Sequence, residues 1–370
     1  MSAAPIPLVD LRAQHAEIAA EVAAGFDRVI ADTAFILGPQ VRAFEDEFAR
    51  FCELPHCVGV ANGTDAIELS VRALGLKAGD EVIVPANTFI ASALGVIRAG
   101  ARPVIVDCDE HQLLAPGRIE AAIGPRTRAV LPVHLFGQLA DMEAIAGIAA
   151  ARGIAVIEDG AQSQGARRHG KPAGSFGAAA AVSFYPGKNL GAYGDAGAVV
   201  TGSEEIAGRL RRLRNWGSET KYHHPEIGFN SRLDTLQAVV LSAKLKRLDA
   251  WNAARRRAAT RYDELLAGLP GVEPPKTLPG NEHVWHLYVV RVARRDEVLA
   301  RLNAAGIGAG IHYPVPLHLH GALNDLGYRA GDFPVAERAA AEILSLPMDP
   351  HIAPEQQERV VAELRKAIAA

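Results

Sequence analysis

The sequence predicts an α/β fold, in which a mostly parallel seven-stranded sheet lies between helices and a smaller α+β domain follows. Seven short apolar runs recur between residues 57 and 200, and helical patterns fill most of the intervals. The runs are continuously apolar rather than alternating, as expected for parallel strands that are buried on both faces. With 370 residues, the chain is longer than one hydrophobic core usually supports, so we expect two domains.

The first part of the chain, residues 1–250, is expected to form the larger domain. Its predicted strands are Cys57–Val60, Val82–Pro85, Pro103–Val106, Ala129–Val133, Ile154–Ile157, Ala180–Phe184 and Gly197–Val200. Its clearest helical patterns are Ala66–Leu74, Ser92–Ala99 and Met142–Ala151. Ligands of such sheets bind beyond the carboxyl ends of the strands, so the residues that follow each run are candidates for a site.

The second predicted domain covers residues 251–370. A long helical pattern with one apolar face, Asp234–Leu269, leads into it. Residues 270–280 then contain four prolines and two glycines, which indicates a linker. Beyond the linker we expect a strand at His286–Val292, a helix at Arg295–Ala305, a strand at Gly308–Tyr313 and two terminal helices.

Composition and charge exclude several classes of protein. Hydrophobic residues make up 49% of the chain and charged residues 22%, as in ordinary soluble globular proteins. The net charge of −3 does not indicate the excess of basic residues that is typical of nucleic-acid-binding proteins. Two basic clusters, Arg209–Arg214 and Arg255–Arg257, fall in helical patterns, and we interpret them as solvated helix faces.

The N-terminal sequence, the short apolar runs and the cysteines indicate a cytoplasmic protein. No basic segment followed by an apolar core occurs at the N-terminus, so no secretory signal is expected. No apolar run approaches the roughly 18 residues that span a bilayer, so we expect no membrane partner. Cys52, Cys57 and Cys108 are odd in number and lack metal-type spacing, so we expect neither a disulfide framework nor a metal site.

The most informative residues are Asp159 and Lys188, each at the end of a predicted buried strand. A carboxylate at such a position is costly unless it is paired, although a helix-capping aspartate is an alternative for Asp159. Lys188 lies in a tight apolar turn, Pro186–Gly191, where desolvation lowers the pKa of its amine and makes it nucleophilic. An amine and a carboxylate at one rim of a sheet suit pyridoxal phosphate, whose aldehyde binds lysine and whose ring nitrogen needs an acidic partner.

Further positions could contribute to such a site. Thr64 begins a helix where backbone N–H groups and its hydroxyl could bind a phosphate, or it could be part of a plain N-cap. Phe89 could stack on a flat ring or pack in the core, and Gln162, expected on a first helical turn, could donate to a phenolate oxygen. Ser183 could donate to the same phosphate as Thr64, whereas His134 is expected to be a supporting hydrogen-bonding residue.

Longer motifs resemble the DegT/DnrJ family of nucleotide-sugar aminotransferases, which are fold type I pyridoxal-phosphate enzymes. The motifs are Gly63-Thr-Asp-Ala66, Pro85-Ala-Asn-Thr-Phe89, Glu158-Asp-Gly-Ala-Gln162, Ser183-Phe-Tyr-Pro-Gly-Lys-Asn-Leu190, Gly228-Phe-Asn-Ser-Arg-Leu-Asp234 and His312-Tyr-Pro-Val-Pro316. They follow the family's order and extend over nearly the whole chain. The resemblance therefore implies a fold type I transferase that uses pyridoxal phosphate.

The resemblance also implies roles for the matching positions. Lys188 corresponds to the lysine that forms the Schiff base with the cofactor and then moves the proton during transamination. In a dehydratase branch of the family histidine replaces this lysine, so Lys188 favours aminotransfer. Asp159 corresponds to the partner of the ring nitrogen and Gln162 to the partner of the ring hydroxyl. The remaining cofactor positions are Thr64, Asp65 and Ser183 for the phosphate, Phe89 for ring stacking, and Asn230, which reaches the phosphate from the neighbouring subunit of a homodimer.

For the substrates, the resemblance implies L-glutamate as the amino donor and a nucleotide-linked sugar as the acceptor. The motifs look most like the branch that acts on dTDP-linked 3-keto-6-deoxyhexoses, whose products enter polysaccharides or glycosylated natural products. The candidate substrate contacts are Tyr185, Lys221, Tyr222, His312, Tyr313 and His318. His312 and Tyr313 could instead pack at the domain interface.

Three alternatives remain open at this stage. A C4-specific sugar aminotransferase or a cyclitol-ketone aminotransferase would belong to the same family. A dinucleotide-binding oxidoreductase has the same kind of sheet, but no G-x-G-x-x-G follows the first strand. A non-catalytic regulator could retain the fold, although the presence of Asp159, Gln162 and Lys188 together argues against lost chemistry.

Overall fold

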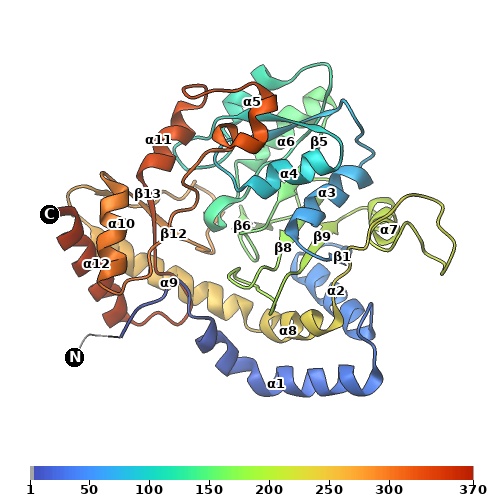
Figure 1. Cartoon of the computed structure of the whole chain (residues 1–370), viewed down its shortest axis with the longest axis horizontal. Coiled ribbons are helices and arrows are strands. Elements are labelled where there is room, and N and C mark those ends of the chain that lie inside the picture. The colour runs from blue at the N-terminus through green and yellow to red at the C-terminus, as the bar shows by residue number, and fades with distance from the viewer. Residues whose placement is uncertain (1–3, 370) are drawn as a thin grey trace.

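A seven-stranded sheet forms the centre of the molecule (Figure 1) in the computed structural model, which describes residues 4–369. Its strands are β1 (His56–Val60), β2 (Glu81–Pro85), β3 (Arg102–Val106), β4 (Thr127–Val130), β5 (Ala155–Asp159), β8 (Ala179–Ser183) and β9 (Gly197–Thr201). They lie in the order β1-β9-β8-β5-β4-β2-β3. All neighbours from β8 to β3 pair in parallel, whereas β9 is antiparallel to both β1 and β8. The predicted mostly parallel seven-stranded sheet is confirmed.

Helices cover both faces of this sheet, which explains why its strands are continuously apolar. Along β9, Val199 packs into one core with α3 (Gly63–Ala73) and α7 (Glu204–Leu213). Its neighbour Val200 faces the other way, into a core with α2 (Pro39–Phe51) and α8 (Thr235–Leu245). Successive side chains of a strand point to opposite faces, so a strand that is covered on both sides needs an apolar residue at every position.

The other helices of the larger part follow the predicted alternation with strands. They are α4 (Ile90–Arg98), α5 (Pro116–Ala122) and α6 (Met142–Arg152). Helix α1 (Leu11–Asp32) lies against α8 at the bottom of Figure 1, where Ile18 and Val22 pack on Val240 and Ala243.

A smaller α+β part contains most of the remaining chain. Its antiparallel sheet has the order β10 (Val272–Glu273), β12 (Tyr288–Val292) and β13 (Ile343–Leu346). This sheet shares a core with α9 (Leu248–Leu266), α10 (Arg295–Ala304) and α12 (Pro354–Ala369). The elements of the whole chain not yet named are α11 (Pro334–Glu342), the short strands β6 (Arg167–Arg168), β7 (Lys171–Pro172) and β11 (Asn281–Glu282), and 3₁₀ turns at Leu135–Gly137, Leu317–Leu319 and Gly321–Leu326.

Helix α9 crosses the predicted domain boundary at residue 250. Its first residue, Leu248, belongs to the core formed with α2 and α8. Tyr262 and Leu266, near its end, belong to the core of the smaller sheet. Since one helix takes part in both cores, the division into residues 1–250 and 251–370 stays a prediction.

Two predicted elements differ from the structure, and one observed strand was not predicted. The expected long helix Asp234–Leu269 is broken into α8 and α9 at Lys246 and Arg247, where neither glycine nor proline marks the break. The expected strand Gly308–Tyr313 is wrong, because only single bridges form there, from Ile307 to Ile6 and from Gly310 to Ser345. Strand β13 was not predicted because it follows α11 directly, without a turn sequence between them.

The basic cluster at Arg255–Arg257 is not a fully solvated face. Arg255 is buried, and its Nη1 donates to the carbonyl groups of Trp285, His286 and Met348. These carbonyl oxygens compensate part of the cost of burying its charge. Cys52, Cys57 and Cys108 are buried free thiols.

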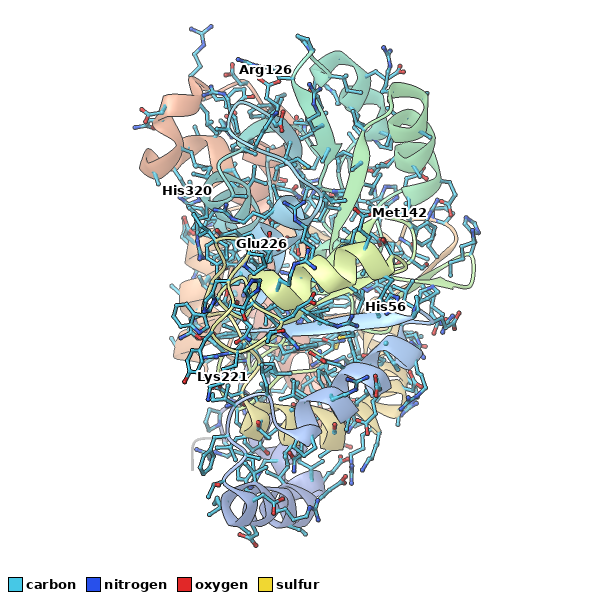
Figure 2. All side chains as sticks on the ribbon, turned by 90° about the vertical axis from the view of Figure 1, so that its right-hand side faces the viewer. His56, Arg126, Met142, Lys221, Glu226 and His320 are labelled. Carbon is cyan, nitrogen blue, oxygen red and sulfur yellow. The ribbon has the colours of Figure 1, made fainter. Side chains whose placement is uncertain are left out.

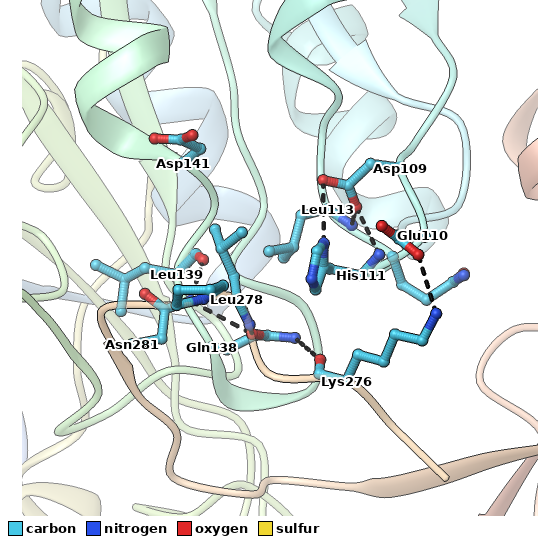
Figure 3. Close-up of polar contacts among 12 residues, drawn as sticks. Asp109, Glu110, His111, Leu113, Gln138, Leu139, Asp141, Lys276, Leu278 and Asn281 are labelled. Atoms are coloured by element: carbon cyan, nitrogen blue, oxygen red, sulfur yellow. Dashed lines mark hydrogen bonds and ion pairs between the residues drawn. The ribbon is translucent and has the colours of Figure 1, made fainter. Parts of the chain in front are cut away.

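The proline-rich linker is held against the larger part by side-chain amides (Figure 3). The Gln138 side chain donates to the carbonyl of Lys276 and accepts from the N–H of Leu278. Asn281 donates to the carbonyl of Leu139, and the Lys276 ammonium pairs with Glu110 at 2.9 Å. These contacts explain why a segment with four prolines is fixed in place. Across residues 4–369, no helix is long and apolar enough to cross a membrane.

Candidate active site

A cavity of about 850 Å³ opens at the carboxyl ends of the central strands, where the topology predicts a ligand. Its walls include Phe89 after β2, Asp159 at the end of β5, and Ser183 and Lys188 at and after the end of β8. Other parts of the chain complete it: Leu8 and Val9 before α1, and His286, Leu287, His312 and Tyr313 from the C-terminal part.

Asp159 is buried in the lining of this cavity, and none of the cationic side chains among residues 4–369 contacts it. Its Oδ2 accepts from the Ser92 hydroxyl at 2.7 Å, and its Oδ1 accepts from the N–H of Ala161 at 3.1 Å. Burial raises the pKa of this carboxyl, while the two hydrogen bonds and the charge of Lys188 act in the opposite direction. The described residues directly after β5 form turns and not a helix, so Asp159 caps no helix.

Lys188 lies in a tight turn whose backbone is fixed by its own N–H, which donates to the carbonyl of Tyr185 at 2.8 Å. Burial lowers the pKa of its amine to about 8, although the Asp159 carboxylate acts to raise it. Its Nζ makes no hydrogen bond or ion pair with any of residues 4–369. The cavity therefore holds a half-buried amine and a buried carboxylate that do not touch.

Gln162 has a fixed orientation at the side of the cavity. The N–H of Phe136 donates to its Oε1 at 2.6 Å, so the amide nitrogen must face the other way. That nitrogen donates to the Tyr313 hydroxyl at 3.1 Å. Gln162 lies in a turn rather than on the expected first helical turn, but its Nε2 points to the cavity wall, as a donor to a ligand oxygen would.

The N-terminus of α3 forms a candidate anion site next to Ser183. The Asn62 side chain caps the helix by accepting from the N–H of Asp65 at 2.8 Å. In the described part of the chain, the N–H groups of Gly63 and Thr64 have no partner. A Cβ at Gly63 would lie 2.6 Å from the Ser183 Cβ, so only glycine lets α3 start this close to β8. Free N–H groups, two hydroxyls and the positive helix end suit a phosphate.

Aromatic rings line the opposite wall. Phe89 is half exposed towards the cavity, and its ring centroid lies 5.1 Å from that of Tyr313. Burial raises the pKa of the Tyr313 hydroxyl, which stays protonated. His312 lies beside them, and burial lowers its pKa to about 4, so it is a neutral ring whose Nδ1 is 2.8 Å from the Ser345 hydroxyl. Tyr185 lies at the exposed rim of the same cavity.

Asp65 supports the anion site from outside the cavity lining. Its carboxylate accepts from the Ser231 hydroxyl at 2.7 Å and pairs with Arg98 at 3.1 Å. Arg98, which was not predicted, lines the cavity itself. The phosphate-binding position expected at Asp65 therefore stays a prediction, and its visible contacts hold neighbouring side chains in place.

Three predicted residues lie on an exposed loop and not in the cavity of their own chain. Lys221 and Tyr222 project from the segment between α7 and α8, and Figure 2 shows Lys221 and Glu226 at the surface of this loop. The Lys221 Nζ lies 5.0 Å from the centroid of the Tyr222 ring. Asn230 is exposed at the base of the loop, where its backbone bridges to Asn215.

His318, another predicted substrate contact, also lies outside the cavity. It is buried, with its Nε2 2.9 Å from the Glu337 carboxylate and its ring edge-on to Phe333. These contacts give it a packing role between a 3₁₀ turn and α11. The substrate contact expected of His318 stays a prediction.

Besides Arg98, sequence reasoning missed Ser92 and His286. Ser92, on the first turn of α4, supplies the hydroxyl that binds Asp159, and its place at the start of the helix that follows β2 could have indicated this. His286 lines the cavity from the smaller part of the molecule. Nothing in the local pattern indicates that position, because it depends on how the linker returns to the central sheet.

Comparison with a family model places the chain within a known group. The model of the DegT/DnrJ/EryC1/StrS aminotransferase family matches residues 16–365. The dTDP-3-amino-3,4,6-trideoxy-alpha-D-glucose transaminase of Streptomyces venezuelae is 49% identical over 362 residues, which cover 98% of this chain and 96% of that protein. The erythromycin biosynthesis sensory transduction protein EryC1 of Saccharopolyspora erythraea is 49% identical over 361 residues, 97% of this chain and 99% of that protein.

Solved structures agree with this grouping. The chain is similar to S. venezuelae DesV in complex with a ketimine intermediate, with a TM-score of 0.96, 49% identity and 98% coverage of both chains. It is also similar to NtdA from Bacillus subtilis with bound cofactor PMP, with a TM-score of 0.93, 31% identity, and coverage of 100% of this chain and 86% of that one. These structures confirm the fold type that the sequence motifs implied.

The lowered pKa of Lys188 predicts a distinctive labelling profile. At pH 8 about half of its amines should be neutral, against less than about 1% for a surface lysine with a pKa near 10.4. Trace acetylation of the unloaded protein from pH 6 to 11, read by peptide mass spectrometry, should therefore show a midpoint for Lys188 near 8. Asp159→Asn removes a charge that raises this pKa, so it should move the midpoint lower still.

Lys244 provides the internal control for this measurement. Burial lowers its pKa to about 8 as well, but it is buried over the Tyr193 ring and lines no part of the cavity. It should be labelled slowly at every pH. A Lys188 midpoint like that of surface lysines, or an upward shift in Asp159→Asn, would contradict the assigned electrostatics.

Proposed function

The chain belongs to the DegT/DnrJ/EryC1/StrS aminotransferase family, and on this premise we propose that it is a pyridoxal-phosphate-dependent enzyme that aminates a nucleotide-linked keto sugar. L-Glutamate would donate the amino group, and the acceptor would be a dTDP-linked 3-keto-6-deoxyhexose. The observation that carries the proposal is the pair of Lys188 and Asp159, which line one cavity without being in contact.

The residues of the cavity fit the chemistry of this cofactor. A phosphate matches the free N–H groups of Gly63 and Thr64 beside the Ser183 hydroxyl. An aldehyde matches a lysine whose amine has a pKa of about 8. A protonated ring nitrogen matches a buried carboxylate that has hydrogen bonds but no cation in contact, as found at Asp159.

When bound, pyridoxal phosphate supplies an aldehyde that takes up amines and a ring that withdraws electrons. The Lys188 Nζ would make the covalent link to that aldehyde and, once released, would move the proton as a general base. Asp159 would keep a proton on the ring nitrogen, and the Gln162 Nε2 would donate to the ring oxygen. Ser92 would hold the Asp159 carboxylate in place through its hydroxyl, which in turn lies 2.9 Å from the Thr88 Oγ1.

Support for the sugar substrate comes from the relatives and from the size of the site. The S. venezuelae relative is named for a dTDP-linked 3-amino sugar. A cavity of about 850 Å³ is at the upper end of the range for ligand sites, which suits a nucleotide sugar better than an amino acid alone. His312, Tyr313 and Tyr185 would contact that substrate. EryC1 is named as a sensory transduction protein, but the complete set of Lys188, Asp159 and Gln162 supports catalysis.

We further propose a homodimer in which each site uses residues of both subunits. Asn230, Lys221 and Tyr222 would reach the partner's cavity, because they are exposed and lie outside their own. Large apolar side chains are exposed near α1 and on the same loop: Ile30, Phe35, Ile36, Trp216 and Ile227. A surface of this kind is typical of a protein interface.

Cofactor attachment is tested by trapping. Purified protein incubated with pyridoxal phosphate should turn yellow, and borohydride should fix the cofactor on the Lys188 peptide, seen as a mass increment. Lys188→Ala should retain cofactor without a covalent link and lose turnover by at least about 10³-fold, because a nucleophile and a base are both removed. Lys244→Met is the matched control and should behave like the wild type. Protein that takes up no cofactor would refute the proposal.

The site of amination is tested by comparing dTDP-linked 3-keto and 4-keto deoxysugars with L-glutamate as donor. We expect turnover of the 3-keto sugar, with NMR placing the new amine on C3. A product with its amine on C4 would instead support a C4-specific sugar aminotransferase. Turnover of a cyclitol ketone alone would support a cyclitol-ketone aminotransferase.

The shared site is tested by complementation between two impaired variants. Lys188→Ala and Asn230→Ala chains with different affinity tags are coexpressed, and the mixed dimers are isolated. One of their two sites combines an intact Lys188 with the partner's intact Asn230, so the mixed dimer should show about half of the wild-type activity. Dimers of two differently tagged Lys188→Ala chains are the control. No recovery in the mixed dimer would show that Asn230 does not act across the interface.

A further inference from the structure

Asn189, the residue after Lys188, has a buried side chain that joins three segments of the chain. Its Nδ2 donates to the Asn252 Oδ1 on α9 at 2.9 Å and to the carbonyl of Val284 at 3.0 Å. Its Oδ1 lies 3.2 Å from the Nδ1 of His286. Asn189 is 1% exposed, so no water competes for these bonds.

Backbone carbonyl groups determine which atom donates in each of these bonds. A carbonyl can only accept, so the Asn189 atom that faces Val284 must be its NH₂ group. In the same way, the carbonyl of Gln164 fixes the NH₂ group of Asn252, 2.9 Å away, and leaves the Asn252 Oδ1 to accept from Asn189. The Asn189 Oδ1 is then an acceptor, and the His286 Nδ1 must carry a hydrogen.

His286 is therefore held in one form. Burial lowers its pKa well below the usual value, and the charges of Lys188 and Arg255 and the neighbouring His312 and His283 act in the same direction. A neutral ring with its hydrogen on Nδ1 leaves Nε2 as a bare acceptor. In the described residues Nε2 has no hydrogen-bond partner, and His286 lines the cavity.

We propose that Asn189 and His286 are positioning residues that fix the turn carrying Lys188, with His286 donating through Nδ1 to Asn189. The inference rests on the proposed function, in which Lys188 is the reacting amine. The bonds run from the loop after β5 through Gln164 and Asn252 to the loop after β8, so the two loops that carry Asp159 and Lys188 are tied together. His286 extends this tie to the smaller part of the molecule.

The bonds of Asn189 matter because the flexible side chain of Lys188 must be held in the right position to react. The Lys188 Nζ has no bond of its own, so its position depends on the backbone of its turn. A displacement of about 1 Å can reduce a rate by about 10²-fold. Loosening the Asn189 bonds should therefore lower kcat more than it changes substrate binding.

Three substitutions of His286 separate the role of Nδ1 from that of Nε2. In His286→Asn the amide nitrogen can take the place of Nδ1, in His286→Gln the amide reaches the place of Nε2, and His286→Leu removes both. We expect kcat to fall by about 30- to 100-fold in the Leu and Gln variants, with KM values changed less than about threefold. The Asn variant should remain within about fivefold of the wild type.

A spectroscopic measurement accompanies these rates. The pH midpoint of the absorption band of the loaded, substrate-free protein reports the surroundings of the Lys188 nitrogen. It should move in the Leu and Gln variants and return towards the wild-type value in the Asn variant. His283→Leu is the matched control, because His283 is equally buried in the same segment but contacts neither Asn189 nor the cavity. It should leave both the midpoint and kcat close to wild type, and thermal melting would show its effect on stability.

Rescue by Gln and not by Asn would overturn the proposal, because His286 would then act on a ligand through Nε2. Wild-type rates and midpoints in the Leu variant would overturn it as well, as would failure of both amide variants in folded protein. The tautomer can be measured without any activity, by ¹⁵N NMR of histidine-labelled protein with His286 assigned by substitution. A hydrogen on Nε2 would refute the inference even where the proposed function holds, and loss of cofactor binding in the wild type would refute the proposed function alone.

Discussion

The structure depends on holding two opposite charges in one cavity without letting them pair. Burial acts on both groups, raising the pKa of Asp159 and lowering that of Lys188 to about 8. In direct contact the two charges would neutralise each other, and neither group would be free to bind a ligand. Instead, Ser92 and the N–H of Ala161 satisfy the carboxylate, while the lysine is held only through the backbone of its turn. A bound ligand can then form favourable interactions with groups that the protein leaves unpaired.

The end of β5 shows how the fold separates a reactive group from a structural one. Glu158 and Asp159 are adjacent, and successive side chains of a strand point to opposite faces. Glu158 is fully buried and accepts from the N–H groups of Gly174, Phe176 and Gly177, with His134 at 2.8 Å. It therefore fixes the segment between β5 and β8, and Asp159 on the other side faces the cavity. His134 has the supporting role that the sequence suggested.

Much of the larger part could be predicted from the sequence because its determinants are local. Continuous apolar runs define the strands, and the residues after them, Asp159 and Lys188, lie at one edge by topology alone. Long-range contacts decided what was missed. The break between α8 and α9 has no breaker residue, and β13 pairs in register with a strand about fifty residues earlier. His286 reaches Asn189 only because the fixed linker brings it there.

The two halves of the cavity differ in how they are built, and this bears on how one fold could serve different substrates. The half around Asp159, Ser183 and the start of α3 is made of strand ends and a helix terminus that the central core holds rigidly. The other half is made of Leu8 and Val9 and the segment at His312 and Tyr313. Loops can change shape with little effect on the core, since they contribute few residues to it. A fixed half for the shared chemistry and a variable half for the sugar would let specificity change without disturbing the buried charges, and the Asn189 bonds keep the reactive lysine in the fixed half.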